Sequence, residues 1–232
     1  MPDECYLCGK PIESDHSMDH VPPKQFYAEE LRLRINLSQL VTIPAHGACN
    51  RAYEKDEEYF TWSLSPLAVG STAGDALARD RVQKLKRRNR LARLYEMVRR
   101  EFDRFPSGLH LPGGRVVKHF DGGRVNRIVW KLARGLYFHH NDSVLPDDTP
   151  FTTELIEPER ARETAGTNAL WERVKSQPPC GSYGGVFEYK YFVATIDDKT
   201  LHSWGMLLWD KIMVFVAHHD PDSPQVLSGA EE

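Results

Sequence analysis

The sequence of 232 residues predicts an α+β fold in three consecutive parts. Two pairs of cysteine and histidine residues predict a small ββα unit that holds a metal ion, within residues 1–62. A strongly basic segment with apolar residues at helical intervals predicts a linker and a long helix within residues 63–107. In residues 108–232, alternating apolar side chains and an amphipathic segment predict an antiparallel sheet packed on a helix.

The first part is predicted to end in a helix. Pro22, Pro23 and Pro44 interrupt any long regular element before it. Residues 50–62 contain neither Gly nor Pro, and their aromatic side chains can be buried on one helical face. Two short strands followed by this helix give the predicted ββα unit.

The second part begins with residues 63–74, which are rich in Ser, Pro and Gly and predict a linker. One long helix is then predicted from near Asp75 to the residues before Pro106. Residues 79–104 carry eleven Lys or Arg against four Asp or Glu, a local charge of +7, although the chain has a net charge of -3. Such a helix can follow a phosphate backbone with little sequence preference. The alternative is an amphipathic helix whose polar face is simply in water.

The third part opens with a short strand predicted at residues 115–120 and a hairpin-type turn at Asp121-Gly122-Gly123. An amphipathic helix is predicted at residues 125–138, followed by a polar loop. Three further strands are predicted at residues 187–193, 203–208 and 212–218, with a tight turn over Trp209, Asp210 and Lys211. We expect these strands to form an antiparallel sheet on the helix.

Composition and cysteine usage narrow the class of protein. No apolar run approaches the roughly eighteen residues that span a bilayer, so we expect a cytoplasmic protein with no membrane partner. Three of the four cysteines fall in the two ligand pairs, and Cys180 stands alone. A metal explains this spacing better than a disulfide framework does. Cys180 is expected to have no functional role.

The two ligand pairs are Cys5-x-x-Cys8 and His46-x-x-Cys49. Each pair fits one tight turn, from which thiolates and an imidazole can reach a zinc ion at about 2.0–2.3 Å. Four protein ligands leave no open position for a substrate, so this zinc is predicted to be structural. The alternative is that His46 and Cys49 are ordinary buried residues.

Asp19 and His20 lie between the two ligand pairs, and Asn50 directly follows the second pair. Folding of the zinc site is therefore expected to bring Asp19 and His20 close to Asn50. Carboxylate and amide oxygens suit a harder cation such as Mg²⁺ or Mn²⁺. A neutral imidazole beside them can accept a proton from water. A rival pair, Asp15-His16, is expected to be a solvated part of the hairpin.

Three segments resemble the HNH nucleases, a family of the His-Me finger (ββα-metal) group, over about residues 3–62. The segments are Cys5-Tyr6-Leu7-Cys8-Gly9, Asp19-His20-Val21-Pro22-Pro23-Lys24 and Ile43-Pro44-Ala45-His46-Gly47-Ala48-Cys49-Asn50-Arg51. The resemblance implies a ββα-metal nuclease domain in which His20 is the general base. It also implies that Asp19 and Asn50 hold one catalytic divalent metal, while Cys5, Cys8, His46 and Cys49 bind structural zinc.

The sequence departs from the family pattern at three positions. His46 replaces the third cysteine of zinc-bearing members, a change that zinc tolerates. Asn50 stands where many members have the final histidine. The middle asparagine that orients the catalytic histidine has no clear counterpart, because Asn36 lies further from the second ligand pair than the pattern expects. A backbone carbonyl is the alternative partner for His20.

Several other groups of polar residues could have a functional role or could simply be solvent-exposed. The acidic run Asp56-Glu57-Glu58 is expected to be solvated, with a further metal ligand as the alternative. The pairs His139-His140 and His218-His219 are expected at the surface, because neither has a Cys or Asp partner at ligand spacing. Cations that can contact nucleic-acid phosphate are predicted at Lys24, Arg51, Lys55, Arg87 and Arg88.

These observations predict a metal-dependent endonuclease that hydrolyses phosphodiester bonds in DNA, and the resemblance implies a setting such as restriction or phage defence. Two alternatives stay open. One is a non-catalytic zinc-knuckle module that binds nucleic acid or protein. The other is an effector whose nuclease is held inactive by residues 108–232, a part that also offers a surface for a homodimer or a regulatory partner.

Overall fold

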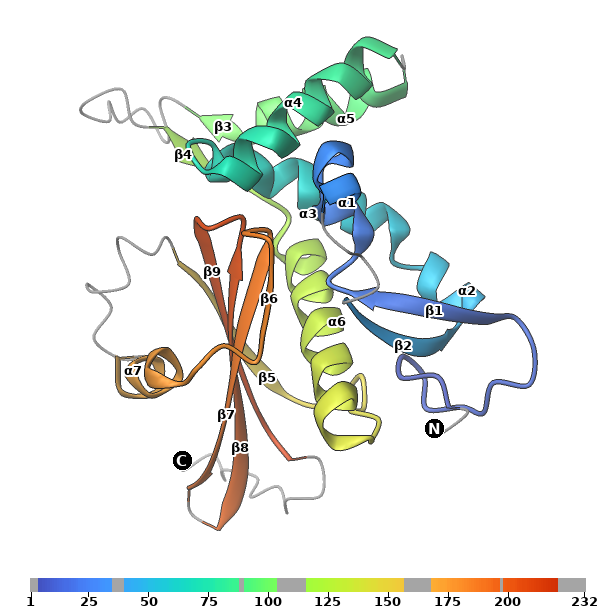
Figure 1. Cartoon of the computed structure of the whole chain (residues 1–232), viewed down its shortest axis with the longest axis vertical. Helices are drawn as coiled ribbons and strands as arrows, with labels where there is room; N and C mark the ends of the chain where they lie inside the picture. The colour runs from blue at the N-terminus through green and yellow to red at the C-terminus, as the bar shows by residue number, and fades with distance from the viewer. Residues whose placement is uncertain are drawn as a thin grey trace, which may run out of the picture.

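A long helix, α6 (Gly122–Asn141), lies between an N-terminal strand pair and a C-terminal sheet (Figure 1). This arrangement is seen in a computed structural model that describes residues 4–34, 40–87, 90–103, 116–156, 168–196 and 198–220. Helix α6 contacts β1, β2 and α3 on one side and strand β9 on the other. The mixture of helix and sheet confirms the predicted α+β class.

The N-terminal part contains an antiparallel pair of strands, with Asp19 opposite Ile43 and His20 opposite Thr42. The strands are β1 (His16–Val21) and β2 (Val41–His46), and η1 (Lys24–Phe26) and α1 (Glu29–Arg34) lie between them in the sequence. The predicted helix over residues 50–62 is two helices, α2 (Gly47–Arg51) and α3 (Glu54–Leu64). Asn50 therefore lies on the short helix that directly follows β2.

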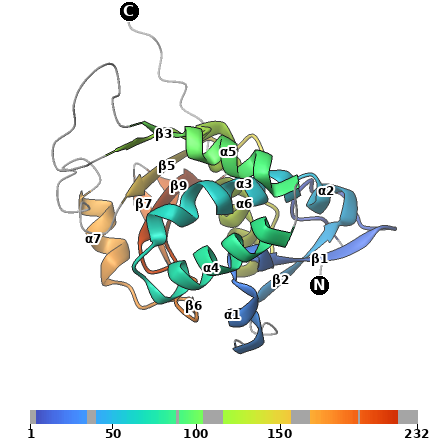
Figure 2. The ribbon, with the colours of Figure 1, turned by 90° about the horizontal axis from the view of Figure 1, so that it is seen from above.

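The prediction of one long basic helix is wrong. The segment forms α4 (Thr72–Arg87), preceded by η3 (Ser65–Ala68), and a separate helix α5 (Arg90–Arg100). Leu85 of α4 and Leu94 and Val98 of α5 pack together around Trp62 of α3. Full burial of an apolar side chain stabilises by about 1.5–3 kcal/mol, and the burial of Val98 with the partial burial of Leu85 and Leu94 favours two packed helices over one extended helix. Viewed from above, α4 and α5 lie in front of α6 (Figure 2).

The connection from α5 to α6 is organised by Glu101. Its carboxylate accepts hydrogen bonds from Ser63 at 2.7 Å, from Tyr59 and from the ammonium of Lys118. The neighbouring strands are β3 (Phe102–Asp103) and β4 (Val117–Lys118), so the predicted strand is only two residues long in the described part of this segment. Asp121 does not begin a hairpin turn. Its side chain accepts from the backbone N–H of Arg124 at 3.1 Å and caps α6.

The C-terminal sheet has the strand order β5-β9-β8-β7-β6, and all its neighbouring strands are antiparallel. The strands are β5 (Phe151–Ile156), β6 (Gly181–Tyr183), β7 (Phe187–Ile196), β8 (Lys199–Leu208) and β9 (Ile212–His219). The three predicted strands correspond to β7, β8 and β9, and the predicted turn at Trp209 and Asp210 is present, with positive φ at both residues.

Helices cover both faces of this sheet. Val214 and Val216 of β9 belong to the core that contains α6. Phe215 and Ala217, which alternate with them, pack with Val174 of helix α7 (Asn168–Ser176). The near-continuous apolar run of β9 is thus explained by burial of both of its faces.

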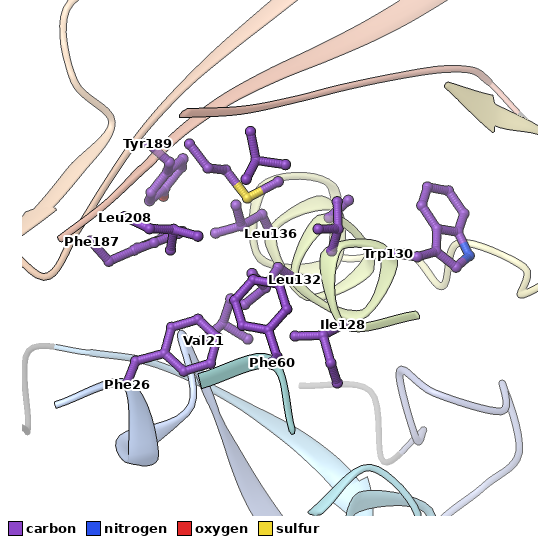
Figure 3. Packing of buried hydrophobic residues seen from close by; sticks show 14 of the residues in the cluster. Val21, Phe26, Phe60, Ile128, Trp130, Leu132, Leu136, Phe187, Tyr189 and Leu208 are labelled. Atoms are coloured by element: carbon purple, nitrogen blue, oxygen red, sulfur yellow. The ribbon is translucent and has the colours of Figure 1, made fainter. Parts of the chain in front are cut away.

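The main core joins the N-terminal part to the sheet through α6. Figure 3 shows Ile128, Leu132 and Leu136 of α6 among side chains from both sides. These neighbours include Val21, Phe26 and Phe60 from the N-terminal part and Phe187, Tyr189 and Leu208 from the sheet. The predicted boundaries after residues 62 and 107 therefore separate segments of sequence that share one core.

Two contacts bring the parts particularly close. The Trp209 indole N–H donates to the Phe26 carbonyl at 2.9 Å, and the Phe26 ring stacks on Phe60 at 5.2 Å between centroids. At Gly135 of α6, a Cβ atom would lie 2.6 Å from Val21 of β1. Glycine at this position lets the helix backbone approach the strand pair.

His218 is buried, with 2% exposure, so its predicted surface location is wrong, whereas His219, His139 and His140 are exposed as predicted. The His218 ring stacks on His202 at 5.0 Å and accepts a hydrogen bond from the Trp204 indole N–H at 3.3 Å. Burial, reinforced by the nearby His202, lowers the pKa of His218 to about 4. The folded protein therefore holds this imidazole neutral.

This burial predicts acid sensitivity. An unfolded histidine has a pKa of about 6.5, so below that pH the unfolded state binds a proton that the folded state does not. The His218 contribution is present above pH 6.5 and is lost as the pH falls toward 4. Between pH 7.5 and 5 we expect it to lower the free energy of unfolding by about 2 kcal/mol.

Urea unfolding at both pH values measures this loss. His218→Gln, which keeps an acceptor for Trp204, should reduce the pH dependence, whereas His219→Gln at the exposed neighbour should not. Equal pH dependence in the wild type and both variants would contradict the assignment to His218.

Candidate functional site

The four predicted zinc ligands lie together, with one ligand atom of each side chain within 4.8 Å of the others. The first pair is set by a tight turn in which the backbone N–H groups of Cys8 and Gly9 donate to the Cys5 carbonyl at 3.2 and 2.8 Å. Gly9 has φ +66°, a left-handed conformation that glycine adopts without strain. The second pair follows from the junction of β2 and α2, which places His46 and Cys49 one helical turn apart.

The orientation of His46 suits a metal ligand. Its Nδ1 lies 3.4 Å from the Cys8 sulfur and 4.0 Å from the Cys49 sulfur, while its Nε2 lies 3.1 Å from the Pro11 carbonyl. A carbonyl only accepts hydrogen bonds, so the proton belongs on Nε2 and the lone pair of Nδ1 faces the sulfurs. A hydrogen bond of this kind to the second ring nitrogen is typical of metal-bound histidines.

The thiols of the cluster affect one another. Burial and the nearby thiols of Cys5 and Cys8 raise the pKa of Cys49 to about 12. The pKa of Cys8 is lowered, because burial is outweighed by hydrogen bonds from the Lys10 backbone and from the Cys5 and Cys49 side chains. A metal ion would displace the thiol protons and neutralise the charge of the resulting thiolates. The cluster can hold a metal such as zinc, whose four ligands would then all come from the protein.

Zinc content tests this cluster directly. We expect Cys49→Ser to lower the metal content from about one zinc per chain to near zero and to destabilise the N-terminal part by several kcal/mol, because metal binding and folding are coupled. Elemental analysis and thermal unfolding measure the two effects. Cys180→Ser is the matched control, since Cys180 is exposed and outside the cluster. Equal zinc content in both variants would contradict the ligand assignment.

Asp19 is buried on β1, with 5% exposure, and its carboxylate accepts three hydrogen bonds. Oδ2 accepts from the Tyr6 hydroxyl at 2.6 Å and from the Lys131 ammonium at 2.8 Å, and Oδ1 accepts from the His20 backbone N–H at 2.9 Å. Burial and the charge of Asp19 raise the pKa of Tyr6 well above its ordinary value. Tyr6 is therefore a hydrogen-bond donor that fixes the carboxylate.

Asn50 reaches the same ammonium. Its Oδ1 lies 3.2 Å from the Lys131 nitrogen, and its amide N–H₂ donates to the Ser17 hydroxyl at 3.4 Å. The structure thus brings together Asp19 and Asn50, which are far apart in the sequence. Both residues direct an oxygen at the Lys131 ammonium.

Glu57 was expected to be solvated, and that expectation is wrong. It has 7% exposure, and its carboxylate accepts from Lys131 at 2.5 Å and from the Gln25 amide at 2.5 Å. Its neighbour Asp56 forms ion pairs with Arg124 and Arg127 at 2.6 and 2.5 Å. Both acids therefore face α6, which the sequence pattern of α3 alone did not indicate.

Sequence reasoning missed Lys131 and Arg134, two buried cations of α6 with 2% and 1% exposure. Burial tends to lower the pKa of Lys131, but Asp19 and Glu57 outweigh it, so the pKa is raised and the ammonium stays charged. The available signal was position. Lys131 lies three residues after Ile128 and four before Gly135, within the helical face that is buried.

Arg134 contacts the turn that carries the first ligand pair. Its guanidinium donates to the carbonyls of Tyr6 and Leu7 at 3.3 and 2.8 Å, within the turn that carries the first ligand pair. It also binds the Leu145 carbonyl and the Asp147 carboxylate at 2.8 and 2.7 Å. Helix α6 therefore places one cation at the ligand turn and another at Asp19.

His20 is half-buried on β1, next to Asp19. Its pKa is lowered by burial and by the positive charge of Lys24, although Asp19 acts in the opposite direction. A neutral imidazole is thus favoured at neutral pH, as a general base requires. Asn36, the weak candidate for orienting His20, lies outside the described residues.

The predicted phosphate-binding cations are exposed where the structure describes them, at Lys24, Arg51, Lys55 and Arg87, and Arg88 lies outside the described residues. Arg51 forms an exposed ion pair with Asp15 at 3.2 Å. Asp15 also accepts from the backbone N–H of Ala48 at 2.7 Å, so this acid of the rival pair holds the start of α2. His16 is exposed, as predicted.

Three comparisons with known proteins accompany this geometry. No protein-family model, no curated protein and no solved structure matches the chain. Within the described ranges, none of the helices is long and apolar enough to cross a membrane.

Proposed function

We propose that the protein is a metal-dependent endonuclease of the HNH type that hydrolyses phosphodiester bonds in DNA. The observation that supports it best is the meeting of Asp19 of β1 and Asn50 of α2 at the Lys131 ammonium. His20 follows Asp19 on β1, and the Cys5–Cys8–His46–Cys49 cluster lies at the end of the strand pair that carries His46. The positions of Asp19, His20 and Asn50 in the fold are compatible with the roles that the sequence predicted for them. We also propose that residues 1–62 form a ββα-metal nuclease unit.

The residues have distinct roles in the proposed reaction. His20, neutral because of its lowered pKa, accepts a proton from the water that attacks phosphorus. The Asp19 carboxylate and the Asn50 amide oxygen fit the ligand preference of Mg²⁺ or Mn²⁺ and would hold that ion. When bound, such an ion supplies positive charge for the phosphate and the leaving oxygen. Zinc on the cysteine and histidine cluster would hold the turn of Cys5 and Cys8 against the junction of β2 and α2, which carries His46 and Cys49.

Replacement of His20 tests the general base. We expect His20→Ala to lower Mg²⁺- or Mn²⁺-dependent plasmid cleavage by about 10²-fold or more, with zinc content and thermal stability retained, because general-base catalysis typically contributes 10²–10⁴-fold. His16→Ala is the matched control, since His16 is an exposed histidine on the same strand.

Retained cleavage in His20→Ala would exclude His20 as the base. No cleavage by the wild type, with zinc bound, would favour the non-catalytic module that binds nucleic acid or protein. Cleavage of RNA but not DNA would keep the chemistry and change the substrate.

The exposed cations of α4 support a nucleic-acid substrate. Lys86 and Arg87 are exposed at the end of this helix. We expect the double variant Lys86→Gln, Arg87→Gln to bind DNA more weakly. The plot of log K against the logarithm of the salt concentration should become less steep by up to about 2, one for each lost phosphate contact. Fluorescence anisotropy over a range of salt concentrations measures the slope.

The control for this measurement is Arg173→Gln with Lys175→Gln. Both residues are exposed on α7, which packs on the sheet away from α4. An unchanged slope in the α4 variant, or an equal loss in the α7 variant, would contradict a specific role for α4.

In the alternative function, residues 108–232 hold the nuclease inactive, but deleting them is not a clean test of this. Deleting these residues removes α6 and, with it, the Lys131 and Arg134 contacts to the N-terminal part. We therefore expect such a deletion to unfold the N-terminal part rather than to release its activity. A role of residues 108–232 in dimerisation or in binding a regulatory partner stays a prediction.

A further inference from the structure

A buried ammonium lies where three protein oxygens meet. The Lys131 nitrogen is 2.8 Å from Asp19 Oδ2, 2.5 Å from Glu57 Oε1 and 3.2 Å from Asn50 Oδ1. The three oxygens come from β1, α3 and α2, whereas the ammonium comes from α6. Two carboxylates and an amide oxygen around one cation are also the donor set that a divalent metal prefers.

We infer that the Lys131 ammonium and a divalent cation are alternative occupants of one oxygen site formed by Asp19, Asn50 and Glu57. Lys131 thereby weakens divalent binding, and Glu57 is a third protein ligand. The inference rests on the proposed function only in so far as Asp19 and Asn50 hold the catalytic metal.

The hydrogen bonds explain why both cations cannot share the site. Asp19 Oδ2 already accepts from Tyr6 and Lys131, and Oδ1 accepts from the His20 backbone. A carboxylate has about four lone-pair positions, so Asp19 has little capacity left while Lys131 is bound. Repulsion between a divalent ion and an ammonium a few ångströms apart adds to this limit, especially in a buried site.

The Tyr53 ring offers the Lys131 ammonium a favourable contact besides the three oxygens. The ammonium lies 5.1 Å from the centre of the Tyr53 ring, within the range of a cation–π interaction. The flexible four-carbon stem lets the ammonium move while the helix stays in place. The Gln25 amide holds the other oxygen of Glu57, so this carboxylate keeps its orientation when Lys131 leaves.

Direct metal binding tests the inference. Mn²⁺ binding to zinc-loaded, full-length protein is measured by electron paramagnetic resonance for the wild type, Lys131→Met and Lys131→Arg. We expect Lys131→Met, which removes the charge and keeps the length of the side chain, to bind Mn²⁺ at least about tenfold more tightly. Lys131→Arg keeps the charge and should bind no more tightly than the wild type. Equal affinity in the wild type and Lys131→Met would overturn the inference.

A second pair of variants identifies the ligands and guards against a folding defect. Glu57→Gln in the Lys131→Met background should reverse the gain in affinity; an unchanged gain would exclude Glu57 as a ligand. Lys131→Gln, whose amide can still donate to a carboxylate, should show the same gain as Lys131→Met. If these variants fold only with Mn²⁺, the metal replaces the ammonium as inferred; failure to fold with Mn²⁺ would overturn the exchange.

Plasmid cleavage measured in parallel separates this inference from the proposed function. Tighter Mn²⁺ binding by Lys131→Met without cleavage by any form of the protein would support the shared site and contradict the nuclease. Cleavage by the wild type with equal Mn²⁺ affinity in both proteins would support the nuclease and contradict the shared site.

Discussion

The N-terminal part depends on two buried cations that α6 inserts into it, Lys131 and Arg134. A buried charge costs several kcal/mol unless it is paired and fully hydrogen-bonded. Lys131 meets Asp19, Glu57 and Asn50, and Arg134 meets two carbonyls of the ligand turn as well as Leu145 and Asp147. Lys131 is thus satisfied only when β1, α2 and α3 are in place, and Arg134 only when the ligand turn and the loop after α6 are in place. The same contacts that stabilise the fold therefore position both candidate metal centres.

The shared core explains why these cations come from a distant part of the sequence. A unit of about sixty residues buries little apolar surface by itself, and its aromatic residues Phe26 and Phe60 complete their packing against Trp209. Gly135 lets α6 approach β1 closely enough for side chains one turn away to reach the acids. Zinc at the cysteine and histidine cluster would add a local restraint to this packing, at the end of the strand pair opposite Val21.

Sequence patterns predicted the features that are set by residues close together in the sequence. Paired ligand spacing located the cluster, alternation located β7, and two apolar segments joined by the turn over Trp209, Asp210 and Lys211 located β8 and β9. Periodicity did not separate α4 from α5, because apolar residues continue at helical intervals in both helices and their packing around Trp62 is a tertiary effect. Asp121-Gly122-Gly123 suits both a turn and a helix start, and only the hydrogen bond to Arg124 decides between them. Glu57, Lys131 and His218 were missed for a common reason, since the partners that allow their burial lie on other elements.

The charges of the site suggest an order in which its ligands bind. Asp19 and Glu57 carry two negative charges and Lys131 one positive charge, so the three buried side chains leave one negative charge. A phosphodiester is repelled by this balance, whereas a cation is attracted. Exposed Lys24 and Arg51 near the strand pair and the basic surfaces of α4 and α5 can hold the phosphate backbone without contacting the acids. In the proposed nuclease, approach of phosphorus to His20 would therefore require added positive charge at Asp19 and Asn50, so the proposal implies that a cation binds first and nucleic acid second.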